Sequence, residues 1–348
     1  MFNLDQLIRP NIKILEPYSS ARDEFTGQAK VYLDANENSF GSPLTKWYNR
    51  YPDPHQWKVK EKLSAIKGVP VPQIFLGNGS DECIDLLFRV FCEPAIDNVL
   101  ICPPTYGMYE VTARINNVDV KKVNLTPNFQ LDLPAIEKAI DDHTKMIFLC
   151  SPNNPTGNNL SLEAIEAILN NYFGLVVVDE AYINFSRYHS LSKLLPEYPN
   201  LVVLQTLSKA WGLAALRLGI AFSSGEICSL LSRIKPPYNI SQSTQDLVLE
   251  ALENVDQVNN MILEIVEQRK VLAEALNNVP RVQTVYPSDA NFLLVKISDA
   301  RACYEFLLKK GIVVRDRSRV ILCDDCLRIT VGTPLENQEL IASIHAIK

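Results

Sequence analysis

Short and almost wholly apolar runs recur along the first two-thirds of the chain, with stretches of helical character between them. They lie at residues 74–76, 98–102, 145–150, 175–178, 201–204 and 218–222, and a more polar run lies at 121–125. Apolar runs of this length indicate strands that are buried on both faces. Since helical stretches separate them, the pattern predicts an α/β fold with a mostly parallel sheet between helices.

The pattern changes beyond Pro236 and Pro237, which interrupt the chain. From about Ser243 to Leu276, apolar residues recur near a period of 3.6. We expect one long helix there, which links a large domain (residues 31–240) to a smaller α+β C-terminal domain (residues 241–348).

Within the smaller domain, strands are expected near 292–297 and 326–331, and helices near 300–310 and 335–346. Prolines and a glycine interrupt residues 1–30, which predicts an N-terminal arm that packs with the small domain. Residues 31–34 are predicted to form a short strand.

Composition narrows the class of protein. The 348 residues are 47% hydrophobic and 21% charged, as in ordinary globular proteins, and the net charge of −6 with no basic stripe argues against a nucleic-acid partner. No apolar run approaches the roughly 20 residues needed to span a bilayer, and no signal peptide is visible. The scattered cysteines favour a reducing, cytoplasmic location, and the lone Cys323-x-x-Cys326 pair is a weak zinc signal, so no metal is expected.

A glycine turn follows the strand at residues 74–76, in the order Gly77-Asn78-Gly79-Ser80-Asp81-Glu82, and an apolar helix follows the turn. Free N–H groups and the positive end of a helix dipole attract anions, so Ser80 and Asp81 are candidates to bind a phosphate. A dinucleotide would require a glycine at position 82, where the chain has Glu82. The alternative is a plain helix with Ser80 as its N-cap.

The stretch Ser208-Lys209, with Arg217 eight residues later, carries the strongest chemical signal. Lys209 follows a buried strand among small and apolar neighbours, where partial loss of hydration makes an amine more nucleophilic. A hydroxyl, an amine and a guanidinium together suit a cofactor that has both an aldehyde and a phosphate.

Asp179 ends another fully apolar strand, and Tyr182 follows three residues later. A buried carboxylate is costly unless it is paired, and a protonated pyridine nitrogen would pair with it. The alternative role for Asp179 is a helix N-cap.

Three further motifs lie in predicted strands or just after them. Tyr106 lies where a flat ring can stack on a pyridine, although it could simply pack in its loop. Asn154 precedes a proline, which holds the backbone of Asn154 extended. An Asn-Pro pair is also a common signal for a plain turn. Arg315 and Arg328 lie in or beside apolar strands and need an anionic partner, which could equally be a structural salt bridge.

In their order and spacing, these motifs resemble the fold-type I pyridoxal-phosphate enzymes and, among them, the class II aminotransferases of the histidinol-phosphate aminotransferase subfamily. The resemblance extends from Tyr18 to Arg328. It implies a large domain with a seven-stranded sheet, pyridoxal 5'-phosphate as cofactor and a homodimer with shared active sites.

The resemblance also implies individual roles. Lys209 would bind the cofactor aldehyde and act as the general base, with Asp179 and Tyr182 as its catalytic partners. Tyr18, Asn154, Arg315 and Arg328 would bind the substrate. The cofactor would be held by Ser80, Asp81, Tyr106, Asn154, Asp179, Tyr182, Thr206, Ser208, Lys209 and Arg217, with Tyr51 contributed by the partner subunit.

The implied reaction transfers an amino group between histidinol phosphate and 2-oxoglutarate in histidine biosynthesis. Similar enzymes include aromatic-amino-acid aminotransferases and a threonine-phosphate decarboxylase, so these substrates stay open. A non-catalytic cofactor-binding protein is an alternative of another class, and the joint presence of Lys209, Asp179 and Tyr182 argues against it.

Overall fold

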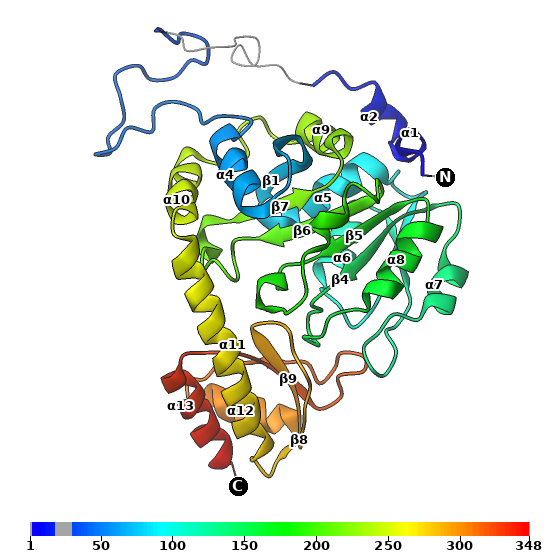
Figure 1. The fold of residues 1–348 in the computed structure, drawn as a ribbon, viewed down its shortest axis with the longest axis vertical. Coiled ribbons are helices and arrows are strands. Elements are labelled where there is room, and N and C mark those ends of the chain that lie inside the picture. The colour runs from blue at the N-terminus through cyan, green and yellow to red at the C-terminus, as the bar shows by residue number, and fades with distance from the viewer. Residues whose placement is uncertain (1, 18–29, 348) are drawn as a thin grey trace.

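A seven-stranded sheet forms the centre of the larger part of the computed structural model, which describes residues 2–17 and 30–347 (Figure 1). The strand order is β1-β7-β6-β5-β4-β2-β3, and only β7 runs antiparallel to its neighbours. This confirms the predicted mostly parallel sheet. The strands are β1 Ile74–Asn78, β2 Asn98–Ile101, β3 Asp119–Lys122, β4 Thr144–Cys150, β5 Leu175–Asp179, β6 Leu201–Thr206 and β7 Leu218–Phe222.

Helices cover both faces of this sheet, and every strand except β3 contributes side chains to both sides. In β5, Val176 and Val178 join one apolar core while Leu175 and Val177 join the other. The first core includes side chains of α4 (Trp57–Lys67) and α8 (Leu162–Asn171), and the second includes those of α5 (Gly79–Phe91), α6 (Met108–Ile115) and α9 (Gly225–Ile234). The central strands are therefore apolar without interruption because neither face meets water.

The remaining elements of this part are short. They are α7 Leu133–Ala139 and the 3₁₀ turns η1 Val71–Gln73, η2 Ile183–Phe185, η3 Leu191–Leu194 and η4 Ala214–Leu216. In the described part of the chain, no helix has the length and apolar character that crossing a bilayer requires.

The C-terminal part contains a second sheet in the order β10-β11-β9-β8, with every pair antiparallel. Its strands are β8 Val282–Val285, β9 Phe292–Ile297, β10 Arg315–Asp316 and β11 Cys326–Thr330, and its helices are α11 Val255–Asn277, α12 Ala300–Lys309 and α13 Pro334–His345. Alternate residues of β9 face two cores: Leu293 packs with the C-terminal helices, whereas Phe292 packs with a core of the large sheet. This places β11, the neighbour of β9, beside the large sheet.

The predicted single helix over 243–276 is wrong, because two helices occupy the segment. They are α10 Gln242–Leu252 and α11, and α10 packs against α4 of the larger part. The side chain of Asn254 donates a hydrogen bond of 3.0 Å to the carbonyl of Glu250 and so satisfies the end of α10. The apolar periodicity continues across this break, which hid it from sequence reasoning.

The described part of the N-terminal arm also differs from expectation. Residues 2–17 form α1 Leu4–Leu7 and α2 Pro10–Lys13, and Ile8 and Ile12 pack into the core beneath α5 and α9 rather than with the small domain. Arg9 reinforces this contact through an ion pair of 3.1 Å with Glu93. The predicted strand at 31–34 is absent, and Leu33 is 86% exposed.

Two glycines allow β7 to touch the turn between β1 and α5. Gly219 pairs with Gly77 across the two strands, and a Cβ atom at Gly219 would lie 2.1 Å from both the carbonyl carbon of Gly79 and the nitrogen of Ser80. Gly79 has a φ of +73°, and a Cβ there would lie 2.6 Å from Nη2 of Arg217. The turn therefore keeps its shape because neither glycine has a side chain.

We predict that Gly219→Ala lowers the free energy of unfolding by roughly 1–3 kcal/mol or more, because the new methyl group meets backbone atoms that cannot rotate away. Urea unfolding would measure the change. Gly107→Ala is the control, since a Cβ there meets nothing within 4 Å and φ is −68°, and we expect a change within about 0.5 kcal/mol. Equal effects at both positions would contradict the close approach.

Candidate active site

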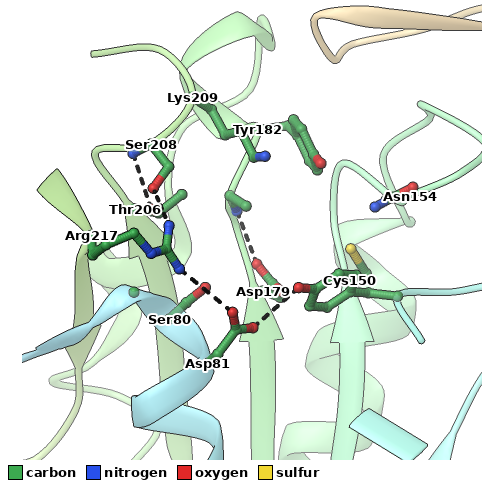
Figure 2. A pocket seen from close by; sticks show the side chains of 13 residues that line it. Ser80, Asp81, Cys150, Asn154, Asp179, Tyr182, Thr206, Ser208, Lys209 and Arg217 are labelled. Carbon is green, nitrogen blue, oxygen red and sulfur yellow. Dashed lines mark hydrogen bonds and ion pairs between the residues drawn. The ribbon is translucent and has the colours of Figure 1, made fainter. Parts of the chain in front are cut away.

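A cavity of about 140 Å³ lies at one edge of the seven-stranded sheet (Figure 2). The carboxyl ends of the parallel strands and the start of antiparallel β7 meet at this edge, where ligands bind in open α/β sheets. Predicted cofactor residues that line the cavity are Ser80, Asp81, Tyr106, Asn154, Asp179, Tyr182, Thr206, Ser208, Lys209 and Arg217. Gly79, Cys150 and Ala181 complete the lining.

One end of the cavity is built to accept an anion. Helix α5 begins at Gly79, and its N-cap residue Asn78 makes no side-chain capping bond, so Ser80 is not the N-cap. The N–H of Gly79 donates to the carbonyl of Arg217, whereas no side chain caps the N–H groups of Ser80 and Asp81, which line the cavity. Arg217 reaches the same place, with Nη1 3.5 Å from Oγ of Ser208 and Nη2 3.8 Å from a carboxylate oxygen of Asp81 (Figure 2).

Asp179 lies at the floor of the cavity and is only 3% exposed. It accepts hydrogen bonds from the hydroxyl of Tyr109 (2.7 Å) and the N–H of Ala181 (3.0 Å). Burial raises the pKa of this carboxyl, against the lowering effect of the two hydrogen bonds and the charge of Lys209. Among the described residues no cation pairs with Asp179 within 4.0 Å. A positively charged group of a ligand would therefore be stabilised beside this carboxyl.

Lys209 enters the cavity from the loop after β6, with its Nζ 5.8 Å from the centre of the Tyr182 ring (Figure 2). The Lys209 side chain is exposed to the cavity, but the walls of the cavity shield its amine from much of the surrounding water. This burial lowers the pKa of Lys209, and the charges of Arg328 and Arg217 lower it further. The amine is thus more readily neutral than that of an ordinary surface lysine, which is what a nucleophile or a base requires.

Two tyrosines line the cavity from different sides. Tyr106 donates a hydrogen bond of 3.1 Å to Asp81 and meets the ring of Tyr109 edge-on, with 5.5 Å between ring centres. Tyr182 packs edge-on against Phe292 of β9, with 5.1 Å between ring centres, and so connects the cavity to the C-terminal sheet. Burial raises the pKa of both hydroxyls, so both stay protonated and can donate hydrogen bonds.

Arg328 of β11 reaches the cavity wall, where it donates a hydrogen bond of 2.6 Å from Nη1 to the side-chain oxygen of Asn154. Arg315 of β10 lies directly across the strand pair from Arg328. Neither arginine forms an ion pair with any residue in the described ranges, so the structural salt bridge that remained open for them is not present.

The predicted residue Tyr51 lies away from the cavity. Tyr51 is 50% exposed and stacks on Tyr238 with 4.3 Å between ring centres, outside the cavity of its own subunit. Tyr18 lies outside the described residues.

Sequence reasoning missed two residues that lie close to the lining of the cavity. Tyr109 lies one helical turn after Tyr106 and holds Asp179 from beneath, but a tyrosine in an apolar helix gives no sign of this role. Arg317 lies two residues after Arg315, and the regular spacing of the two was the available signal.

In the described segments, no group of three or more His, Cys, Asp or Glu side chains is placed so that it could hold a metal ion. Cys323 and Cys326 are both buried and free, as are the other six cysteines.

Residues 28–344 match the family of class I and II aminotransferases. The histidinol-phosphate aminotransferase of Cytophaga hutchinsonii is 55% identical to this chain over 98% of both chains. Similar solved structures are the histidinol-phosphate aminotransferases of Clostridium acetobutylicum (TM-score 0.80, 24% identity, covering 86% of this chain and 91% of that one) and of Sinorhizobium meliloti in complex with pyridoxal-5'-phosphate (TM-score 0.79, 23% identity, covering 89% of both). The two structures support the fold.

We predict that Asp179→Asn makes the unliganded protein more stable at pH 7. The pKa of Asp179 is raised in the folded state, so the unfolded chain loses this proton first, and the stability of the wild type falls as the pH rises above the unfolded value of about 3.9. Asparagine does not ionise, so the variant escapes this loss. Urea unfolding from pH 3 to pH 7 would show a difference that grows with pH, and a variant that is less stable at pH 7 would contradict the assignment.

Proposed function

Because the chain belongs to the aminotransferases of class I and II, we propose that it is a histidinol-phosphate aminotransferase with pyridoxal 5'-phosphate as its cofactor and 2-oxoglutarate as the amino acceptor. The name of the Cytophaga relative, which matches nearly the whole chain, supports the substrate. The observation that carries the proposal is that Lys209, Asp179 and the uncapped first turn of α5 line one cavity.

The residues of the cavity fit this cofactor at each of its polar groups. The uncapped N–H groups of α5, the hydroxyls of Thr206 and Ser208 and the Arg217 guanidinium suit its phosphate. Asp179, buried without a cation among the described residues, suits its ring nitrogen. When bound, the cofactor supplies an aldehyde that bonds to amines and a ring that accepts an electron pair.

The side chains then divide the work of moving protons. Burial lowers the pKa of Lys209. Its Nζ atom would take the proton from Cα of the amine substrate and deliver it to the aldehyde carbon of the cofactor, which is bonded to the same nitrogen. Asp179 carries the negative charge that keeps the ring nitrogen protonated, and Tyr109 and Ala181 hold its two oxygens in place. Tyr182 and Asn154 face the cavity from the side of Arg328, where they orient the ring and its substituents.

Two substrates must use the same site in turn, because the amino group is first taken from one and then given to the other. Arg315 and Arg328 suit both, since a guanidinium fork binds a phosphate or a carboxylate. An aromatic-amino-acid substrate or threonine phosphate would use the same clamp, and the substrate experiment below distinguishes them.

We also propose a homodimer in which Tyr51 of one subunit serves the cavity of the other. Tyr51 lies outside its own cavity, on a segment with several exposed apolar side chains, among them Phe40 (95% exposed) and Trp47 (62% exposed). An apolar surface of this kind is typical of an interface between subunits. The eight free cysteines support a cytoplasmic location, where thiols stay reduced.

In single-turnover experiments, we expect histidinol phosphate to convert the bound cofactor to its aminated form, as followed by the change in visible absorbance. Phenylalanine and threonine phosphate should react far more slowly. Lys209→Ala should slow the reaction by about 10²–10⁴-fold, the usual contribution of a positioned base, while the surface control Lys138→Ala should react like the wild type. Faster conversion by phenylalanine than by histidinol phosphate would contradict the proposed substrate.

Shared sites predict that two defective subunits rescue each other. In a hybrid of a Lys209→Ala subunit with a Tyr51→Phe subunit, one site carries both changes and the other carries neither. At limiting cofactor, such a purified hybrid should regain about half of the wild-type activity, whereas each homodimer stays below it. A hybrid no more active than the mean of the two homodimers would show that Tyr51 serves its own subunit.

A further inference from the structure

Three arginines gather where the C-terminal sheet meets the cavity. Arg315 and Arg328 are cross-strand neighbours on β10 and β11, and the N–H of Arg317 continues this pairing with a hydrogen bond of 2.9 Å to the carbonyl of Cys326. Arg315 and Arg317 are two residues apart in an extended segment, so their side chains share one face. Burial lowers the pKa of Arg317, and the like charges of Arg328 and Arg315 lower it further, which agrees with this proximity.

The acid nearest in sequence does not neutralise the cluster. Asp316 lies between the two arginines but is bound on the other side by Arg301 (3.4 Å) and by the N–H of Ser318 (2.8 Å). Across residues 2–17 and 30–347, none of the three clustered arginines forms an ion pair. The Nε atoms of Arg317 and Arg328 are buried and have no hydrogen-bond partner. Buried, unpaired donors of like charge are unfavourable, and an anion is what would compensate them.

The cluster lies beside the part of the cavity that a substrate would occupy. Arg328 bonds to Asn154, which lines the cavity on the side away from Arg217 (Figure 2). The charges of Arg328 and Arg317 both act on Tyr182, another residue of the lining. The cofactor phosphate would be held at the Arg217 end, so the arginine cluster is left for a second anion.

We infer that Arg317 is a third guanidinium of the substrate-anion site and that it gives the site its preference for a phosphate monoester over a carboxylate. This inference rests on the proposed function. A carboxylate carries one charge and two oxygens, which two guanidinium forks satisfy. A phosphate monoester carries nearly two charges and three terminal oxygens at pH 7, so only it uses the third guanidinium fully.

The test compares kinetics of the holoenzyme with histidinol phosphate and 2-oxoglutarate. Arg317→Gln should raise KM for histidinol phosphate about 10- to 100-fold, the usual cost of a lost charged hydrogen bond, with kcat within about threefold. KM for 2-oxoglutarate should change by less than about threefold. Arg317→Lys should restore part of the affinity, because it returns the charge without the fork. Arg319→Gln, which removes an exposed charge two residues away, should change neither KM.

Two further readouts separate a binding role from a structural one. Below about pH 6 the phosphate monoester loses its second charge, so the KM ratio between Arg317→Gln and wild type should shrink there. Without substrate, Arg317→Gln should melt at the same or a higher temperature than the wild type, since it removes a half-buried charge that has no ion-pair partner among the described residues. With inorganic phosphate added to the holoenzyme, the melting temperature of the wild type should rise more than that of the variant.

An equal rise in both KM values, or a lower melting temperature for Arg317→Gln without added phosphate, would overturn the inference. If the wild type does not react with histidinol phosphate, the proposed function fails. The inorganic phosphate titration still decides the role of Arg317 in that case, because it needs no turnover. An equal response of wild type and Arg317→Gln to phosphate would then reject Arg317 as an anion ligand.

Discussion

A carboxyl group buried at the end of a strand is the constraint on which the rest of the site depends. Asp179 is held by Tyr109 from α6 and by the N–H of Ala181, so its two oxygens have fixed positions. Burial of the ionised carboxylate costs free energy, and a cation bound beside it offsets that cost. The sheet edge, the loop of Lys209 and the turn before α5 all surround this point, so that a ring bound against Asp179 reaches each of them.

The opposite ends of the cavity present positive charge in two different ways. The end near Arg217 belongs to the large sheet and uses backbone N–H groups, which are rigid because they start a helix. The end near Arg328 belongs to the small sheet and uses long side chains, which can adapt to different anions. A permanently bound group suits the first arrangement, and substrates that exchange during each cycle suit the second.

Much of this could be predicted from the sequence, for identifiable reasons. The central strands were recognised because burial on both faces makes them apolar throughout, and the polar residues that follow them mark the edge of the sheet. Strand β8 was missed because its residues are half exposed, and β10 because it has only two. Tyr109 was missed because its partner, Asp179, lies 70 residues away. The role proposed for Arg317 rests on the lack of an ion-pair partner among the described residues, and only the fold shows that Asp316 is bound elsewhere.

The contact between Gly219 and the turn at Gly79 has a consequence for the life of the protein in the cell. The turn at Gly79 lies against the main chain of β7, so a nascent chain with this edge of the sheet out of register lacks the turn in this shape. Ligand binding then favours correctly registered molecules by mass action. The chain with its cofactor bound is therefore expected to resist proteolysis better than the same chain without it.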